Sequence, residues 1–453
     1  MTSKCIMHPD AKKFLDQYPE VDTIEALITD CNGSSRGKWL PVSKLSEVLQ
    51  DGIKLPQSAI AQDVWGRDVP RISYDNGDLD GVCKVVPGSL RPLLTERGVD
   101  QGQVVLSMFT DEDTPVMSDP RQVLAKVMEG FSARGWIPRV AIELEFNLFD
   151  RPSEGQSYRD ALPTREATGG NLYGLGALDE RSDLLEALRE TFTVQSLPYE
   201  GVLKEAAPEQ YEVNVSYSDD ALGYCDQIIR MQRSIRSVAS RFDTFASFMP
   251  KPMEGQAGNG MHIHCSLLDA DGNNLFDDGT ESGTPLLQEA IAGCLALLPD
   301  VHLIFAPSYN AYRRFQPENH APTLPNWGYD NRTTALRIPA GPSHATRIEH
   351  RVAGADANPY LAVAAVLAGI LMGIDRKLEP PAAIEGNAWA EDEDSEPLPG
   401  NMAASIQRFS KSSAVAEYLG ADFQFAFREI KQQELLEFEG RVTDFELETY
   451  LQI

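Results

Sequence analysis

The stretch Gly258-Asn259-Gly260-Met261-His262-Ile263-His264-Cys265-Ser266 decides how the rest of the chain is interpreted, because it places two imidazoles on alternate residues. In an extended segment, alternate side chains point to opposite faces of a sheet. His262 and His264 then share one face, while Met261, Ile263 and Cys265 share the other. The stretch therefore predicts a strand with a polar, ligand-rich face above an apolar underside.

Three other segments show a similar alternation of charged side chains. Glu143 and Glu145 alternate between residues 140 and 149, and Glu349 and Arg351 alternate between residues 347 and 351. Glu212 lies in the segment 210–215, with Glu205 just upstream. Taken singly, a Glu-x-Glu pair is more often solvent-facing, and a His-x-His pair is structural as often as it binds metal.

Carboxylates crowded on one sheet face repel each other and lose solvation, so a folded chain tolerates them only when cations lie between them. Divalent metal is the simplest source of such cations. Five glutamates with one histidine, and no thiolate, suit Mg²⁺ or Mn²⁺ better than zinc. The sequence thus indicates a site for hard divalent cations.

Composition restricts the classes of partner. Lys and Arg number 40 against 68 Asp and Glu, giving a formal net charge of −28 over 453 residues. This charge argues against nucleic acid and anionic membranes as partners and would attract a cationic small molecule. The same acidity can also serve solubility alone. The length predicts two or more domains.

Cysteine usage and hydropathy predict a cytoplasmic protein. The six cysteines are scattered without a Cys-x-x-Cys pair, which is typical of a reducing compartment. Residues 1–13 contain no apolar core of a secretory signal. The longest apolar run, residues 360–374, is too short to span a bilayer and is interpreted as a buried, Ala-rich helix.

Several elements can be located from turn and cap residues. Strands are expected at residues 24–28 and 38–40, separated by a turn at Asn32-Gly33. Asp119 and Pro120 supply an N-cap and an N1 proline for a helix through about Ala133. Residues 158–176 and 390–399 are expected to be surface loops, and a domain boundary follows the acidic loop 111–115.

Six ordered motifs resemble the glutamine synthetase superfamily, and the resemblance runs from about residue 20 to the C-terminus. They are residues 141–146, 205–213, 258–266, 306–314, 331–339 and 347–361. The resemblance implies an α+β fold. An N-terminal β-grasp domain would occupy residues 18–114. A catalytic domain built on a curved antiparallel sheet with flanking helices would occupy residues 115–453.

The resemblance also implies an ATP-dependent ligase that joins the γ-carboxylate of L-glutamate to an amine through γ-glutamyl phosphate. By motif position, the resemblance implies that Glu145, Glu205 and Glu212 would bind the metal that meets glutamate and amine. It likewise implies that Glu143, His262 and Glu349 would bind the metal that holds the ATP phosphates.

Other residues acquire expected roles in the same way. Gly258, Arg314 and Arg351 would bind glutamate, and Tyr217, His264, Ser266, Arg337 and Arg347 would bind ATP. Arg332 would stabilise charge on the transferring phosphoryl group. The arginines could instead pair with surface acids, and His264 could be purely structural.

The chain departs from the glutamine-forming pattern at several positions. Pro56 replaces an aspartate that helps to hold ammonium, and Glu209 replaces a glycine. His320 stands where a loop glutamate normally takes the amine proton, and Glu318 could substitute only if the loop shifts by two residues. Trp389 replaces the tyrosine that many bacterial relatives adenylylate, so that regulation is not expected.

These departures favour an amine larger than ammonium, as in the bacterial γ-glutamylpolyamine and γ-glutamyl-monoamine synthetases that the chain resembles. Trp65 could line the amine pocket but is interpreted as a core residue. The alternatives are a glutamine synthetase that uses ammonia and a catalytically silent structural or regulatory relative. A homo-oligomer, a dodecamer by resemblance, is also expected.

Overall fold

A six-stranded sheet forms the N-terminal part of the protein. The computed structural model describes residues 7–75, 77–158, 172–280, 282–315, 321–389 and 396–453. The strand order is β2-β1-β6-β4-β3, with β5 also paired to β6, and only β1 and β6 run parallel. The strands are β1 (Thr23–Thr29), β2 (Ser35–Pro41), β3 (Ile53–Pro56), β4 (Asp80–Val85), β5 (Arg91–Thr95) and β6 (Gly98–Phe109).

An eight-stranded sheet forms the larger part. Its order is β12-β13-β14-β11-β7-β9-β8, with β10 also paired to β7. All of its pairs are antiparallel except β12 with β13. The strands are β7 (Ile137–Asp150), β8 (Tyr199–Lys204), β9 (Gln210–Val215), β10 (Thr244–Ser247), β11 (Met261–Leu268), β12 (Trp327–Tyr329), β13 (Leu336–Ile338) and β14 (Ile348–His350).

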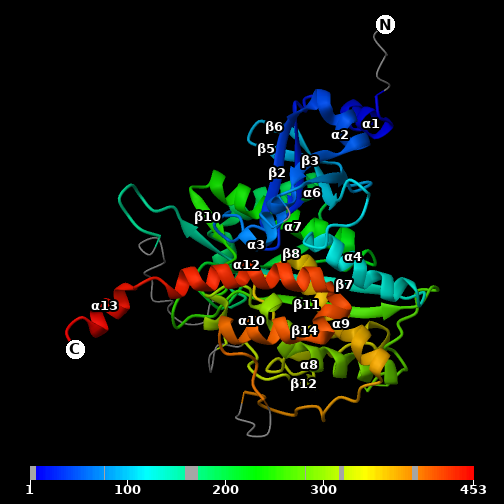
Figure 1. Ribbon diagram of the computed structural model, residues 1–453, viewed down its shortest axis with the longest axis vertical. Helices are drawn as coiled ribbons and strands as arrows, with labels where there is room; N and C mark the ends of the chain where they lie inside the picture. The colour runs from blue at the N-terminus through cyan, green and yellow to red at the C-terminus, as the bar shows by residue number, and fades with distance from the viewer. Residues whose placement is uncertain (1–6, 76, 159–171, 281, 316–320, 390–395) are drawn as a thin grey trace.

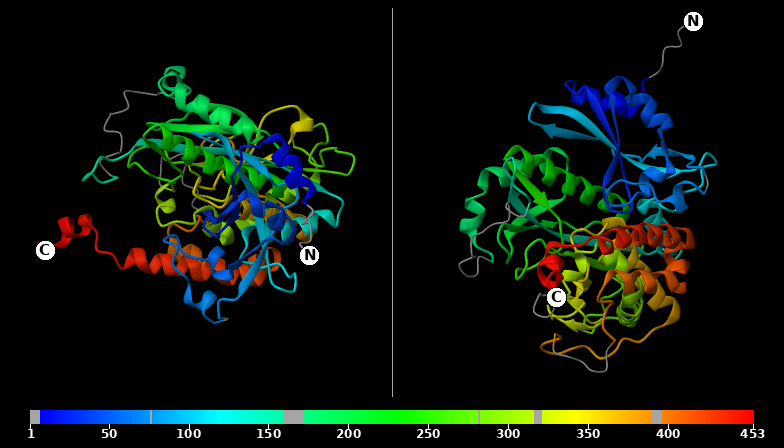
Figure 2. Two further views of the ribbon diagram at one scale, coloured as in Figure 1. Left: turned by 90° about the horizontal axis from the view of Figure 1, so that it is seen from above. Right: turned by 60° about the vertical axis from the view of Figure 1, so that its left-hand side comes forward.

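Helices cover the larger sheet and connect it to the smaller one (Figure 1). In Figure 2 the smaller sheet stands over the green helices α6 and α7, and α13 extends away from the body. The helices are α1 (Pro9–Gln17), α2 (Leu45–Asp51), α3 (Pro70–Ser73), α4 (Pro120–Ser132), α5 (Leu175–Asp179), α6 (Ser182–Val194), α7 (Ala221–Arg241), α8 (Pro285–Phe305), α9 (Pro359–Arg376), α10 (Met402–Lys411), α11 (Ser413–Val415), α12 (Ala421–Glu439) and α13 (Asp444–Tyr450).

The predicted strand pair and helix cap are confirmed, whereas most residues of the predicted loops 158–176 and 390–399 lie outside the described residues. The segment 24–40 forms the antiparallel pair β1 and β2. Asp119 caps α4 by accepting a hydrogen bond from the Arg121 backbone N–H at 2.9 Å, and Pro120 is the first helical residue. All strands of the smaller sheet precede residue 115 in the sequence, and all strands of the larger sheet follow it. The domain boundary at this position and the β-grasp assignment both stay predictions.

Helices α8 and α9 form the interior of the larger part. The predicted Ala-rich helix is α9, and its 18 residues are long and apolar enough to cross a membrane, as are the 21 residues of α8. The prediction that this apolar segment is too short to span a bilayer was therefore wrong. In the most apolar windows of α8 and α9, 78% and 83% of the residues are buried inside the protein, as in core helices of soluble proteins.

Candidate active site

The predicted ligand-rich face exists, and it is built from four neighbouring strands. Strand β11 lies between β7 and β14, so that His262 is opposite Glu143 and His264 is opposite Glu349. On the other edge of β7, Glu145 is opposite Glu212 of β9. The residues between them, such as Met261 and Ile263, are fully buried in the core below. The alternation expected from the sequence thus brings the carboxylates and imidazoles of distant segments onto one face.

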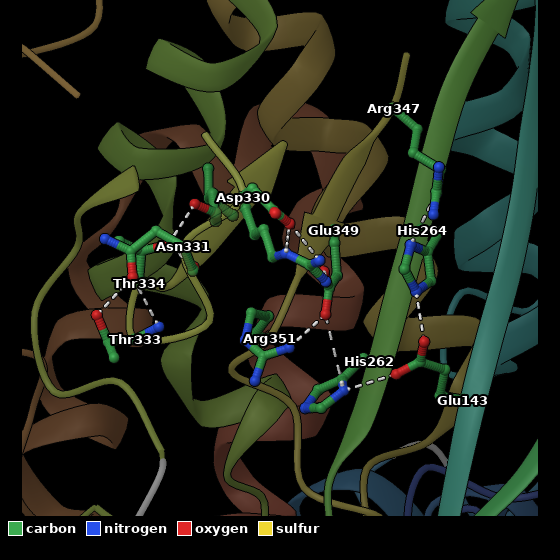
Figure 3. Close-up of polar contacts among 12 residues, drawn as sticks. Glu143, His262, His264, Asp330, Asn331, Thr333, Thr334, Arg347, Glu349 and Arg351 are labelled. Atoms are coloured by element: carbon green, nitrogen blue, oxygen red, sulfur yellow. Dashed lines mark hydrogen bonds and ion pairs between the residues drawn. The ribbon is translucent and has the colours of Figure 1, made fainter. Parts of the chain in front are cut away.

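Glu143 forms the centre of one half of this face (Figure 3). Its Oε2 lies 2.9 Å from His262 Nδ1, and its Oε1 lies 3.0 Å from His264 Nε2. Arg347 Nε donates to His264 Nδ1 at 3.2 Å, so His264 carries its proton on Nε2 and donates it to Glu143. Burial opposes ionisation, but these imidazoles hold the pKa of Glu143 well below its usual value.

Glu349 is the most buried carboxylate of the face, with 1% of its surface exposed. Arg337 Nη1 donates to its Oε2 at 2.8 Å, and Arg351 donates to its Oε1. Arg337 also donates to Asp330 at 2.6 Å (Figure 3). Burial would raise the pKa of Glu349, but Arg351 and the nearby imidazoles lower it overall. Arg337, predicted to bind ATP, and Arg351, predicted to bind glutamate, therefore both pair with Glu349, a predicted metal ligand.

Glu145, Glu205 and Glu212 form the other half of the face, where carboxylates outnumber cations. Glu145 and Glu212 are 7% and 6% exposed. Burial, together with repulsion from Glu143, Glu145 and Glu205, raises the pKa of Glu212 to about 9. Burial and Glu145 also raise the pKa of Glu205. This half of the face is thus short of positive charge.

The donor set fits divalent cations. Glu143, His264 and Glu349 can each offer one ligand atom within 4.8 Å of the others. In the second half, a cation held by Glu145, Glu205 and Glu212 would offset the repulsion that raises the pKa of Glu212. His264, which was expected to contact the nucleotide, thus also lies among the candidate metal ligands.

Two of the three predicted glutamate-binding residues, Gly258 and Arg314, pack together near Glu145, and the third, Arg351, contacts Glu349. A Cβ on Gly260 would lie 3.2 Å from Glu145 Oε1 and 3.3 Å from Arg314 Nη2, so these groups converge on one backbone position. A Cβ on Gly258 would lie 2.4 Å from Pro250 O and 2.7 Å from Arg314 Cγ. Glycine is therefore required at position 258 chiefly by the close approach of the Pro250 carbonyl oxygen, with Arg314 packed beside it. Arg314 is buried, and repulsion from Arg351 adds to burial in lowering its pKa.

Four of the five predicted nucleotide residues line one cavity of about 700 Å³. They are Tyr217, His264, Ser266 and Arg347, and Glu143 reaches the same cavity. The Arg139 guanidinium lies 4.5 Å from the centroid of the Tyr217 ring, which forms a flat, cation-bearing wall. The fifth residue, Arg337, lies instead between Glu349 and Asp330.

Of the three predicted catalytic residues, Arg332 alone lies in the described part of the chain. Arg332 is exposed and lines a separate cavity with Asp330 and residues 383–386. Arg337, and to a lesser extent Arg332, lower the pKa of Asp330. Glu318 and His320 lie outside the described residues, and their roles stay predictions.

The departures from the family pattern have structural correlates. Glu209 has a φ of 50°, in the left-handed region that favours glycine, and Arg181 holds its carboxylate at 2.9 Å. Pro56 is exposed in β3 of the smaller sheet. The interpretation of Trp65 as a core residue was wrong. Its side chain is 41% exposed and packs on Phe438 of α12.

Some residues of the site were missed by the sequence reasoning. Gln210 Nε2 donates to Glu145 Oε2 at 3.2 Å, and Asn214 Nδ2 donates to Glu212 Oε1 at 2.7 Å. Asp330 anchors Arg337, and Arg139 lines the cavity. The same period-two pattern would have placed Gln210, Asn214 and Arg139 on the polar face. Asp330 offered no such signal, because it follows a three-residue strand.

Residues 117–450 match the family model of the glutamine synthetase catalytic domain. The chain belongs to the glutamine synthetase family. The family and the ligase class predicted from the sequence are therefore confirmed, and enzymes of this family use ATP and divalent metal ions.

Similar proteins cover almost the whole chain. A gamma-glutamylputrescine synthetase of Escherichia coli K12 is 37% identical over 98% of this chain and 94% of its own length. A gamma-glutamylethanolamide synthetase of Streptomyces coelicolor is 32% identical over 94% of this chain and 92% of its own length. A solved GmaS complex with ADP superposes with a TM-score of 0.86 at 25% identity, covering 98% of this chain and 100% of that one. The predicted α+β fold is thus confirmed.

Proposed function

We propose that this glutamine synthetase family member joins the γ-carboxylate of L-glutamate to a polyamine or a monoamine, with ATP converted to ADP. The observation that carries the proposal is the face of Glu143, Glu145, Glu212, His262 and Glu349 beside a cavity large enough for a nucleotide. Relatives that act on putrescine and on ethanolamine, similar over more than nine tenths of the chain, favour an amine other than ammonia.

The reaction has two balanced steps. The γ-phosphoryl group of ATP passes to an oxygen of the glutamate γ-carboxylate, which releases ADP and leaves γ-glutamyl phosphate. The amine nitrogen then attacks the carbonyl carbon, phosphate leaves, and the nitrogen loses one proton. His320 or Glu318 would accept that proton.

The residues of the face divide these tasks. Glu145, Glu205 and Glu212 would hold one divalent cation, and Glu143, His262 and Glu349 another. Bound cations supply the positive charge that lets two anionic substrates approach each other. Arg314 and Arg351 would hold the α-carboxylate of glutamate, because a planar guanidinium can donate two parallel hydrogen bonds.

The remaining arginines face the phosphates in this proposal. Arg337 and Arg347 would bind the phosphates of ATP, with Tyr217, His264 and Ser266 on the rest of the nucleotide. Arg332 would stabilise charge on the transferring phosphoryl group, which requires it to move from the separate cavity that it lines here.

A panel of amines tests the proposal. ADP release would be measured with glutamate and putrescine, spermidine, ethanolamine, methylamine or ammonium, with mass spectrometry of the product. Turnover with at least one organic amine, at concentrations where ammonium gives little, is the expected result. Glutamine as the main product would show that the hypothesis that Pro56 and His320 favour an amine larger than ammonium is wrong.

Glutamine synthesis is the second candidate, because a glutamine synthetase of Pyrococcus abyssi is 31% identical over 94% of this chain. A catalytically silent relative is disfavoured, since such a protein would have no need to keep four buried or half-buried glutamates together on one face. Absence of ADP release with every amine and with ammonium would support the silent form.

A further inference from the structure

A second cavity, of about 790 Å³, lies between the smaller sheet and α7. Figures 1 and 2 show the smaller sheet standing over this helix. Its walls come from the turn before β2, from β5, from α6 and α7, and from the end of β7 at Arg151. It shares no lining residue with the cavity beside Glu143.

The lining of this cavity has the opposite charge to the protein. The twenty described residues that line it include Arg151, Arg233 and Arg236 but no Asp or Glu, although the chain carries a net charge of −28. Serines 34, 35, 234, 237 and 240 add hydroxyl groups. A cavity lined by one sign of charge concentrates counter-ions of the other sign.

Only one of these arginines has a carboxylate partner in the described part of the chain. Arg233 Nε donates to Glu25 Oε1 at 2.7 Å, and Glu25 also accepts hydrogen bonds from Trp39 and Gln103. Among the described residues, Arg236 and Arg151 take part in no ion pair. Desolvation in the cavity wall and repulsion from Arg233 lower the pKa of Arg236.

The two unpaired guanidinium groups gather on one side of α7. Arg236 lies with its guanidinium 4.6 Å from the centroid of the Phe248 ring. Arg151 Nη2 donates to Ser240 Oγ at 2.6 Å, and Ser240 is one helical turn after Arg236. Each guanidinium keeps further N–H groups for an anion with planar oxygens.

We propose that this cavity binds a small organic anion with two or more phosphoryl or carboxylate groups, held by Arg151 and Arg236. The hydroxyl group of Ser237, also on α7, would donate a further hydrogen bond to the anion. Such a ligand would join α7 to the smaller sheet and would be distinct from the substrates of the catalytic face.

Titration calorimetry of the assembled protein with pyrophosphate, citrate and inorganic phosphate tests this site. The double variant R151Q/R236Q and the two single variants are compared with wild type and with R189Q, which removes one positive charge from α6, where Arg189 pairs with Glu186. Pyrophosphate or citrate should bind about tenfold or more weakly to the double variant and unchanged to R189Q. The preferred probe distinguishes phosphoryl from carboxylate ligands.

Anion binding to the catalytic face is common to all of these proteins and cancels in the comparison. The single variants R151Q and R236Q, each expected to bind severalfold more weakly, decide the question if the double variant does not fold. Equal affinities in wild type and variants, or no binding up to about 10 mM, would overturn the proposal. A change in oligomeric state of the double variant by sedimentation would also overturn it, because the arginines would then hold a second copy of the chain.

Discussion

Among the single residues, Glu145 distinguishes a carboxylate that binds metal from one that only forms ion pairs. Glu145 accepts hydrogen bonds from the Gly260 backbone N–H at 2.7 Å and from Gln210, and a glutamine can keep an oxygen acceptor at this place. E145Q should therefore fold normally. Its ATP turnover should fall by about 100-fold or more, because one negative charge is lost from the metal site.

The matched control for E145Q is E186Q, in which an exposed glutamate loses only its pairing with Arg189. Turnover and thermal unfolding of both variants would be measured together. Turnover of E145Q close to that of E186Q would contradict the metal assignment.

Arg351 tests the assignment of the glutamate pocket. Lysine keeps the charge beside Glu349 but cannot donate two parallel hydrogen bonds to a carboxylate. R351K should raise KM for glutamate about tenfold or more while the KM for the amine changes about twofold or less. Steady-state kinetics with each substrate varied in turn measures this split, and equal changes in both constants would mean that Arg351 does not bind glutamate.

The sequence predicted the positions of the ligands better than their partners. Period-two alternation put Glu143, Glu145, His262 and His264 on one face, and strand pairing did the rest. It could not predict that Arg337 pairs with Glu349 or that Arg332 lies apart, because the loops around the short strands β12 to β14 determine those contacts.

At the element scale, the packing of α8 on α9 supports the sheet from below. A Cβ on Gly293 of α8 would lie 2.1 Å from the Gly369 carbonyl oxygen and 2.3 Å from the Gly373 nitrogen of α9. G293A should therefore separate the helices and lower the free energy of unfolding by about 1–3 kcal/mol. Urea denaturation followed by circular dichroism measures the change.

The control for G293A is G176A in α5, where no atom lies within 4 Å of the added methyl group. That variant should be as stable as wild type or slightly more stable, because alanine restricts the unfolded chain. Equal stability of the two variants would show that α8 and α9 do not pack as closely as described.

Helix α8 also gives the protein a dependence on pH. His302 is fully buried against Tyr312, with Ser405 Oγ 3.3 Å from its Nδ1. Burial, followed by repulsion from Arg314, lowers the pKa of His302 to about 3 from 6.5. Between these values the unfolded chain binds a proton that the folded chain does not, so stability falls as the pH drops from 6.5 towards 3.

H302Q removes this proton linkage and leaves a side chain that can bond Ser405. On going from pH 7.5 to pH 5, wild type should lose about 2 kcal/mol more stability than H302Q. Urea denaturation of both proteins at the two pH values measures the difference. Equal losses would show that His302 is protonated in the folded protein.

At the scale of the whole molecule, the order of the motifs along the chain was enough to predict the fold class, which the larger sheet and the comparisons confirm. The position of Trp65 could not be predicted in this way. It packs on Phe438, which is more than 370 residues away, so its exposure depends on where α12 lies. The dodecamer, implied by resemblance only, stays a prediction that sedimentation of the protein would test.

We expect the nucleophile of this enzyme to be an organic amine and not ammonia. The most direct test is a competition in one vessel, with ATP, glutamate, and putrescine, ethanolamine and ammonium at equal concentrations. Mass spectrometry then gives the ratio of γ-glutamyl-amine products to glutamine. One γ-glutamyl amine should exceed glutamine by about tenfold or more, since Pro56 offers no charge to hold ammonium. Glutamine as the dominant product would contradict this expectation.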